Sequence, residues 1–288
     1  MGICFTLPSD QRLAMSFVVN VEEGAEQSIA AGDKRPEPVD ELGVSLRIPI
    51  RNYVNESNYL YGIKAGAARV MRLLEEHQFT CTFTAAAVAL EKAPELARAI
   101  AGGGHEVCSH GHRWVHQFSF DEDREREFIR AATESLLMSV GQRPLGWLSR
   151  YLFTANTRRL LVEEGYFYHM DDLGDDVPRW EFVQIGSSQQ PIVIVPYAID
   201  TNDMKMWMTP AYSPAQWLEY AIDSFDQLYD EGVSQPKIMS LGVHLRIIGR
   251  PGRIGALAKF MQHVACRKDV WVTTRLAIAR RFAELNPF

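Results

Sequence analysis

The feature that most constrains the fold of this chain is the alternation of short apolar segments with longer amphipathic ones. Strand-like apolar runs cover residues 13–21, 79–85, 105–109, 191–197, 237–244 and 270–273. Helical spacing of apolar residues separates them, at 65–76, 94–100, 121–140, 156–164, 214–231, 252–266 and in a last segment that ends at Leu285. Near-continuous apolar strands that alternate with helices are typical of a parallel sheet covered by helices, and their number favours a (β/α) barrel.

The 288 residues fit one domain that covers 1–288, because no linker rich in Pro, Gly or Ser divides them. Residues 25–60 interrupt the alternation with scattered Gly, Pro and Asn, and we interpret them as irregular. Loops of this length are uncommon in a compact domain unless they have a role, so we expect residues 25–60 to wall a binding site.

Composition narrows the class of partner. The formal net charge is −6, and no block of Lys and Arg is present that would neutralise a run of phosphates, so we do not expect nucleic acid as a partner. Four scattered cysteines without Cys-x-x-Cys spacing do not indicate a disulfide framework. No apolar run approaches the length of a membrane span, and no signal peptide is evident. We therefore expect a soluble, cytoplasmic protein that does not bind membranes.

Polar residues follow the predicted strands at the ends where barrel enzymes carry their chemistry. They are Asn20, Glu22 and Glu23 after the first strand, His110 after a second, Ser149 and Arg150 after a third, and His244 with Arg246 after a late one. Asn202 lies just after the apolar run 191–197 and is also well placed for a pocket.

Glu22 and Glu23 are adjacent carboxylates at the end of an apolar strand. Burial and mutual repulsion would raise at least one pKa toward the range of a general base, although an exposed acidic turn is the plainer interpretation. His110 can project into the same mouth or be a structural histidine. His244 is a candidate acid or hydrogen-bond donor, and Trp114 is expected to line the cleft.

The imidazoles of His105, His110, His112 and His116 suggest a metal site, but their spacing argues against one. His105 begins its strand and so belongs to the opposite end of the sheet. His112 and His116 would share a face only on a helix. Among the basic residues after His244, Arg246 and Arg250 lie beside a helix N-terminus where an anion would be favoured, whereas Arg253 is better interpreted as a helix cap. The acidic loop at 171–176 is typical of a solvated turn or a cation site of low specificity.

Six motifs, in order, resemble the polysaccharide deacetylase (NodB-homology) superfamily, and within it the allantoinase and cyclic imide hydrolase branch. They are Asn20-Val21-Glu22-Glu23-Gly24, Ser109-His110-Gly111-x-Arg113-Trp114, Arg143-Pro144-x-Gly146-Trp147, the segment 156–165, Asp200-Thr201-Asn202-Asp203-Met204 and His244-x-Arg246-x-Ile248-Gly249-Arg250-Pro251-Gly252-Arg253. The resemblance implies a distorted (β/α)7 barrel, hydrolysis of a C–N amide bond and a homo-oligomer.

Typical members of that superfamily carry an Asp-Asp pair, one base and one metal ligand, and two histidines in a His-[Ser/Thr]-x-x-His motif. In this sequence Glu22 and Glu23 occupy the positions of the Asp-Asp pair. His110 matches the first histidine of the motif, and Trp114 replaces the second. The resemblance therefore implies a broken metal site and no cofactor, with a divalent metal such as zinc as the alternative. It also implies that His244 assists the leaving group or the oxyanion.

From these residues we expect a hydrolase that opens a small cyclic amide or imide without a metal ion, through water activated by Glu22 or Glu23. His110 and His244 complete the predicted catalytic set, and Asn20, Trp114, Arg150, Asn202, Arg246 and Arg250 are the predicted substrate contacts. The alternatives are allantoinase, a metal-dependent N-deacetylase in which His112 or His116 supplies the missing ligand, and a catalytically silent binding protein.

Overall fold

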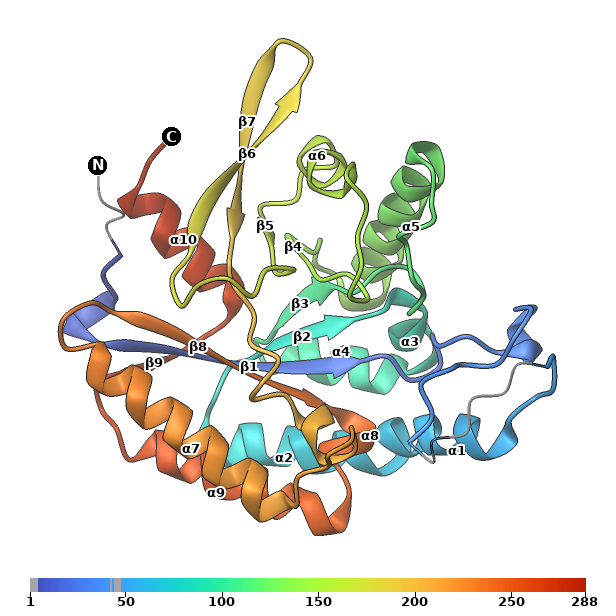
Figure 1. The fold of residues 1–288 in the computed structure, drawn as a ribbon, viewed down its shortest axis with the longest axis horizontal. Coiled ribbons are helices and arrows are strands. Elements are labelled where there is room, and N and C mark those ends of the chain that lie inside the picture. Colours follow the sequence, from blue (N-terminus) through green and yellow to red (C-terminus); the bar gives the residue numbers. More distant parts are fainter. Residues whose placement is uncertain (1–4, 42, 44–47) are drawn as a thin grey trace.

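The computed structural model describes residues 5–41, 43 and 48–288, and within these residues nine strands form one sheet (Figure 1). The strands are β1 (Leu13–Val21), β2 (Thr82–Ala85), β3 (Glu106–Ser109), β4 (Gly146–Trp147), β5 (Tyr168–His169), β6 (Arg179–Ile185), β7 (Ser188–Ile194), β8 (Lys237–His244) and β9 (Val270–Val272). Their order is β6-β7-β5-β4-β3-β2-β1-β8, and β9 pairs with β1. All of the pairings are parallel except that of β6 with β7, which confirms the predicted α/β fold with a mostly parallel sheet.

Strand β1 pairs with three other strands, and all nine of its residues are buried. It pairs with β8 along one edge and with β9 and then β2 along the other. The register places Asn20 beside both Thr84 of β2 and His244 of β8. The carboxyl ends of these strands therefore meet at one level, where the polar residues predicted from the sequence gather.

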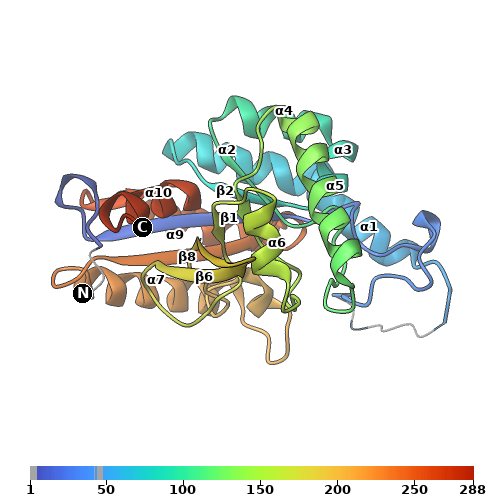
Figure 2. The ribbon, with the colours of Figure 1, turned by 90° about the horizontal axis from the view of Figure 1, so that it is seen from above.

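The helices cover the outside of the sheet. They are α1 (Tyr53–Tyr61), α2 (Ala67–His77), α3 (Ala87–Lys92), α4 (Pro94–Gly102), α5 (Glu122–Val140), α6 (Thr157–Glu163), α7 (Pro214–Glu231), α8 (Leu245–Ile248), α9 (Pro251–Ala265) and α10 (Arg275–Leu285). In the view from above, α2 to α5 lie on one side and α7 on the other (Figure 2). Helix α5 packs against α3, α4 and α6, and α9 against α2 and α7, so the helices form a continuous outer layer.

The sheet is not closed, so the barrel is a distorted one, as predicted. Between β8 and the segment after β7, side chains take the place of a strand ladder. The buried guanidinium of Arg275 donates to the carbonyls of Val195 and Pro196 and to the Ser240 hydroxyl of β8. The Tyr197 hydroxyl also occupies this gap, only 2.0 Å from where a Cβ on Gly242 would lie. These groups satisfy backbone atoms that a neighbouring strand would otherwise pair.

One local prediction was wrong, and two elements were missed. Residues 53–61, interpreted as part of an irregular loop, form helix α1, which continues through a π-helical segment (Gly62–Gly66) into α2. Helix α3 was not predicted because its six residues are too few to show a period. The β6–β7 hairpin was not predicted either, although Gly186 at φ +57° marks its turn. Residues 42 and 44–47 of the predicted loop lie outside the described residues.

Two further observations bear on the sequence-based expectations. Cys81, Cys108 and Cys266 are all unpaired, while Cys4 lies outside the described residues. None of the helices in the described part of the chain is both long enough and apolar enough to cross a membrane.

Candidate active site

Strands β1, β3 and β8 bring Asn20, Glu22, His110 and His244 together at the wall of one cavity, as predicted. The cavity has a volume of about 370 Å³. Apolar side chains form most of the remaining wall: Trp114, Leu148, Tyr151, Phe153, Met170, Leu173, Ile199, Met204 and Met208. A few polar groups in a mostly apolar hollow of this size are typical of a small-molecule site.

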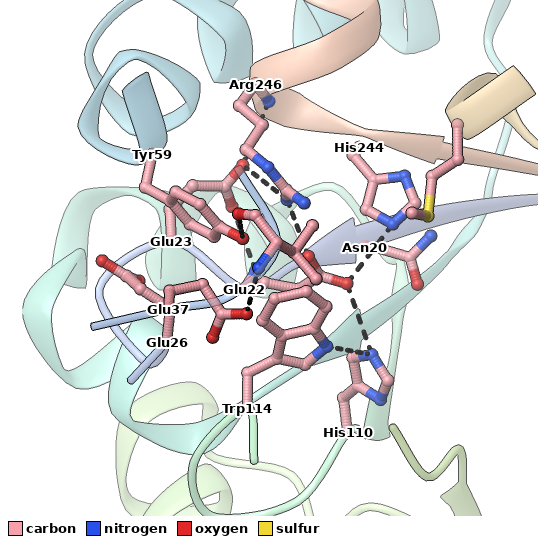
Figure 3. A network of polar contacts seen from close by, with 12 residues as sticks. Asn20, Glu22, Glu23, Glu26, Glu37, Tyr59, His110, Trp114, His244 and Arg246 are labelled. Carbon is pink, nitrogen blue, oxygen red and sulfur yellow. Dashed lines mark hydrogen bonds and ion pairs between the residues drawn. The ribbon is translucent and has the colours of Figure 1, made fainter. Parts of the chain in front are cut away.

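Glu22 is the central group of the site, with a side chain that is 2% exposed (Figure 3). Its Oε2 accepts a hydrogen bond from Arg246 Nη1 at 2.6 Å, and its Oε1 lies 3.3 Å from His244 Nε2 and 3.5 Å from His110 Nε2. Burial acts to raise the pKa of Glu22, but the charges of His244 and Arg246 outweigh it and hold the pKa well below its usual value. Glu22 is therefore an ionised carboxylate at neutral pH.

His244 is held as an imidazolium between two carboxylates. Asp203 Oδ1 accepts from His244 Nδ1 at 2.7 Å, and Asp203 Oδ2 accepts from the backbone N–H groups of His244 and Ile248 at 2.8 and 3.1 Å. Burial acts to lower the pKa of His244, but Glu22 and Asp203 raise it to about 10. The proton on Nε2 consequently points toward Glu22 and is available as an acid.

His110 is fixed by two partners on opposite sides of its ring. Its Nδ1 lies 2.7 Å from the Leu148 carbonyl, so Nδ1 carries the hydrogen, and Nε2 accepts from Trp114 Nε1 at 3.1 Å. This assignment of the tautomer follows from the partners. The Trp114 indole thus occupies the lone pair of His110 Nε2 and holds the ring in place beside Glu22.

The donor set does not fit the metal site of typical deacetylases. A bound cation needs lone pairs that converge on it, yet Trp114 donates to His110 Nε2 and the Arg246 guanidinium occupies Glu22 Oε2. Among the described residues, no three His, Cys, Asp or Glu side chains are grouped so that they could bind one metal ion. The alternative ligand His116 instead contacts the Arg150 carbonyl through Nδ1 and stacks on Tyr151.

Glu23 lies behind Glu22 and does not line the cavity. Its oxygens accept hydrogen bonds from the backbone N–H groups of Glu22 and Arg246, both at 3.0 Å. Burial raises the pKa of Glu23 to about 7, against the lowering effect of the Arg246 charge. One pKa of the pair is thus raised, as the sequence suggested, but it belongs to the glutamate that is away from the cavity.

Arg246 is fully buried and faces the two glutamates rather than the cavity. Its guanidinium lies 4.3 Å from the centre of the Tyr59 ring, and its Nε is 3.5 Å from Glu41 Oε1. Arg246 is therefore placed to bind and orient Glu22, whereas the sequence suggested that Arg246 contacts the substrate.

The other predicted contacts divide into two groups. Asn202 lines the cavity, with its Nδ2 donating to the Tyr197 hydroxyl at 3.1 Å. Arg150 also lines it, but donates to Glu37 and to the Trp114 carbonyl. Arg250 lies outside this cavity, where it borders a different hollow and donates to Asn58. The structure therefore separates Arg250 from the other predicted site residues.

Sequence reasoning missed three carboxylates at the site. Asp203, which orients His244, belongs to a segment already marked as pocket-forming, so its position after an apolar strand was the available signal. Asp171 was assigned to a solvated turn or a weak cation site, yet its side chain is 6% exposed and lines the cavity. Glu37, from the predicted wall segment 25–60, holds Arg150.

Comparisons with known proteins show the family and the fold of this chain. The family described as "Polysaccharide deacetylase" matches residues 59–168. A putative polysaccharide deacetylase of Schizosaccharomyces pombe is 32% identical, over 98% of this chain and 93% of that protein. The crystal structure of Puue allantoinase superposes with a TM-score of 0.91 at 39% identity, covering 98% of this chain and 94% of the other. A probable polysaccharide deacetylase from Pseudomonas aeruginosa PAO1 gives 0.91 at 38% identity, with the same coverage.

Proposed function

Because the chain belongs to the polysaccharide deacetylase family, a family of hydrolases, we propose that it opens a small cyclic amide or imide by adding water to a ring carbonyl, without a metal ion. The observation that carries the proposal is the pairing of an ionised Glu22 with a protonated His244 at the wall of one small cavity. Environments that push two pKa values apart are typical of a base and its partner acid.

In the proposed reaction, Glu22 takes a proton from a water molecule as the water oxygen attacks the ring carbonyl. The tetrahedral intermediate collapses when the C–N bond breaks, and His244 Nε2 gives its proton to the leaving nitrogen. The products are a carboxylic acid and an amide or amine on the opened ring. The His110 ring, held by the Trp114 indole, packs beside Glu22, and Asp203 keeps His244 in its charged form.

The negative charge on the carbonyl oxygen needs donors that are already in place. The His244 imidazolium is such a donor before it gives up its proton, and one preorganised donor contributes roughly 3–4 kcal/mol in comparable sites. Arg246 does not contact the substrate in this reaction. It acts through Glu22, because its hydrogen bond keeps that carboxylate ionised and oriented.

The size of the cavity supports a small ring. About 370 Å³ is near the lower end of the range for small-molecule pockets. Allantoin is the second candidate, because a relative at 39% identity is named an allantoinase. A cytoplasmic location and a homo-oligomer stay predictions, and light scattering of the purified protein tests the second.

The test is a screen of succinimide, glutarimide, hydantoin, dihydrouracil, allantoin and an N-acetylated sugar, with purified wild-type protein and the variants Glu22→Gln and Glu23→Gln. We expect hydrolysis of at least one ring and a loss of about 10²- to 10⁴-fold in kcat for Glu22→Gln. Glu23→Gln serves as the neighbouring control and should retain more activity, since Glu23 does not line the cavity.

Hydrolysis of the sugar alone would favour an N-deacetylase. A protein that binds a ring but turns over none of the compounds would favour a silent binding protein. Equal losses in the two variants would contradict the assignment of Glu22 as the base.

A further inference from the structure

Asp171 is a carboxylate in the cavity wall that the proposed reaction does not use. It follows β5 by two residues and lines the same cavity as Glu22 and His244, with a side chain that is 6% exposed. A nearly buried carboxylate beside apolar groups such as Met170 and Leu173 is costly unless its oxygens find donors.

Only one oxygen of Asp171 is paired. Oδ2 accepts from the backbone N–H of Ser149 at 2.7 Å and lies 2.5 Å from His169 Nε2. Oδ1 has no donor among the described residues. It is also absent from the set of buried atoms without a partner, so it retains access to the cavity that the residue lines.

The orientation of the Asp171 carboxylate is fixed by His169. His169 is fully buried, and its Nδ1 faces Arg158 Nε at 3.5 Å, so the hydrogen of the ring is on Nε2 and is donated to Asp171. The edge-to-face contact of the His169 and Phe153 rings, at 5.2 Å, further restrains the imidazole. With Oδ2 held by two donors, rotation cannot exchange the two oxygens without breaking both hydrogen bonds.

The neighbouring Asp172 provides a contrast. Both of its oxygens are paired, with Arg179 at 3.1 and 2.5 Å, Arg158 at 3.4 Å and the backbone N–H of Gly174 at 3.0 Å. Asp172 also lines the cavity, but its oxygens are occupied by these donors. Asp171 instead presents an acceptor oxygen, without a donor among the described residues, to whatever enters the cavity.

We propose that Asp171 is a specificity-determining residue that accepts a hydrogen bond from a ring N–H of the substrate. The substrate class is then narrowed to cyclic amides, imides or ureides with at least one unsubstituted nitrogen. This inference rests on the proposed function of the site. A ring without an N–H would turn a carbonyl or methyl group toward Oδ1 and leave a desolvated carboxylate unpaired.

The experiment compares succinimide with N-methylsuccinimide, each rate divided by that of hydroxide alone so that intrinsic reactivity cancels. The proteins are the wild type, Asp171→Asn, Asp171→Ala and the matched control Asp172→Asn. In Asp171→Asn the amide oxygen must remain at the Oδ2 position to accept from Ser149 and His169, so the NH₂ group faces the cavity. We expect kcat/KM for succinimide to fall about 100-fold in that variant, with much less change for the N-methyl compound.

The decisive quantity is the ratio of the two kcat/KM values, which loss of folded protein does not alter. The ratio should collapse in both Asp171 variants and stay at the wild-type value in Asp172→Asn. Calorimetric binding of both compounds to the wild type adds a readout without turnover, and succinimide should bind more tightly.

The outcomes separate the two proposals. If the wild type opens rings but the ratio is the same in all four proteins, Asp171 does not select the N–H, and only this inference fails. If the wild type neither binds nor opens any unsubstituted ring, the proposed function fails and the inference fails with it.

Discussion

Glu22 and Glu23 are chemically identical neighbours, and their surroundings give them different roles. Glu22 faces the cavity between two cationic side chains, which hold its pKa well below its usual value despite burial. Glu23 lies against Gly62 and accepts only backbone N–H groups at short range, and burial raises its pKa to about 7. A single residue step along the chain thus separates a buried, ionised carboxylate that lines the cavity from a buried one that does not.

Asp203→Asn tests the role of the imidazolium. In the wild type, His244 stays protonated until the pH rises through about 10, so activity that needs this acid should fall above that pH. Removing the charge of Asp203 lowers the pKa of His244, and the alkaline limb should therefore move to lower pH. The measurement is kcat against pH for both proteins on the best ring substrate.

The variant Tyr220→Phe, which changes an exposed side chain on α7, is the control for this profile. An alkaline limb at the same pH in the wild type and in Asp203→Asn would contradict the assignment of His244 as the acid.

Much of this residue-scale arrangement could be predicted from the sequence. Asn20, Glu22, His110 and His244 follow predicted strands, and parallel strands bring such residues to one edge. What Arg246, Glu37 and Asp171 contact could not be predicted, because their partners lie far away in the chain or on short elements without a period. Arg246 binds Glu22, which lies 224 positions earlier.

At the scale of elements, the continuous run of α1, the π-helical segment and α2 supports the site from behind. Gly62 begins the π-helical segment and packs directly against Glu23. Gly66, in the same segment, approaches the backbone carbonyl of Leu245, which lies between His244 and Arg246. Helix packing here therefore positions both glutamates and the arginine that clamps one of them.

Gly62→Ala should lower stability, because the added Cβ would lie 2.3 Å from Glu23 Oε1. Overpacking of this kind typically costs about 1–3 kcal/mol. Gly255→Ala in α9 is the matched control: nothing lies within 4 Å of its Cβ, and a helix interior favours Ala by up to about 1 kcal/mol. Urea unfolding measures both free energies, and equal stability of the two variants would show that the contact at Gly62 is not tight.

The longer elements were predictable and the shorter ones were not. Helices α5 and α7 and strand β8 lie within a residue or so of their predicted positions, because long segments show their period clearly. Helix α10 ends at Leu285, as predicted. Strands β4 and β5 have two residues each, and α3 has six, so no period exists to detect.

At the scale of the whole molecule, the predicted fold, a distorted (β/α)7 barrel, is confirmed, and its sheet is not closed. Between β8 and the segment after β7, side-chain hydrogen bonds form a seam. Sequence patterns predict where strands lie, but they do not predict which two neighbouring strands lack backbone hydrogen bonds to each other. Here the seam depends on Arg275, a residue of α10, reaching the Val195 and Pro196 carbonyls and the Ser240 hydroxyl. The seam leaves the carboxyl ends of β1, β3 and β8 together, so the site does not require closure.

The central proposal is that this family member hydrolyses a ring with its own side chains, because Trp114 and Arg246 donate to the lone pairs of His110 and Glu22 that a metal ion would need. The most direct test is the rate of ring opening by protein stripped with EDTA, with metal content checked by mass spectrometry. The account predicts the same kcat before and after stripping and after zinc is added back. Loss of activity on stripping and its recovery with zinc would contradict it.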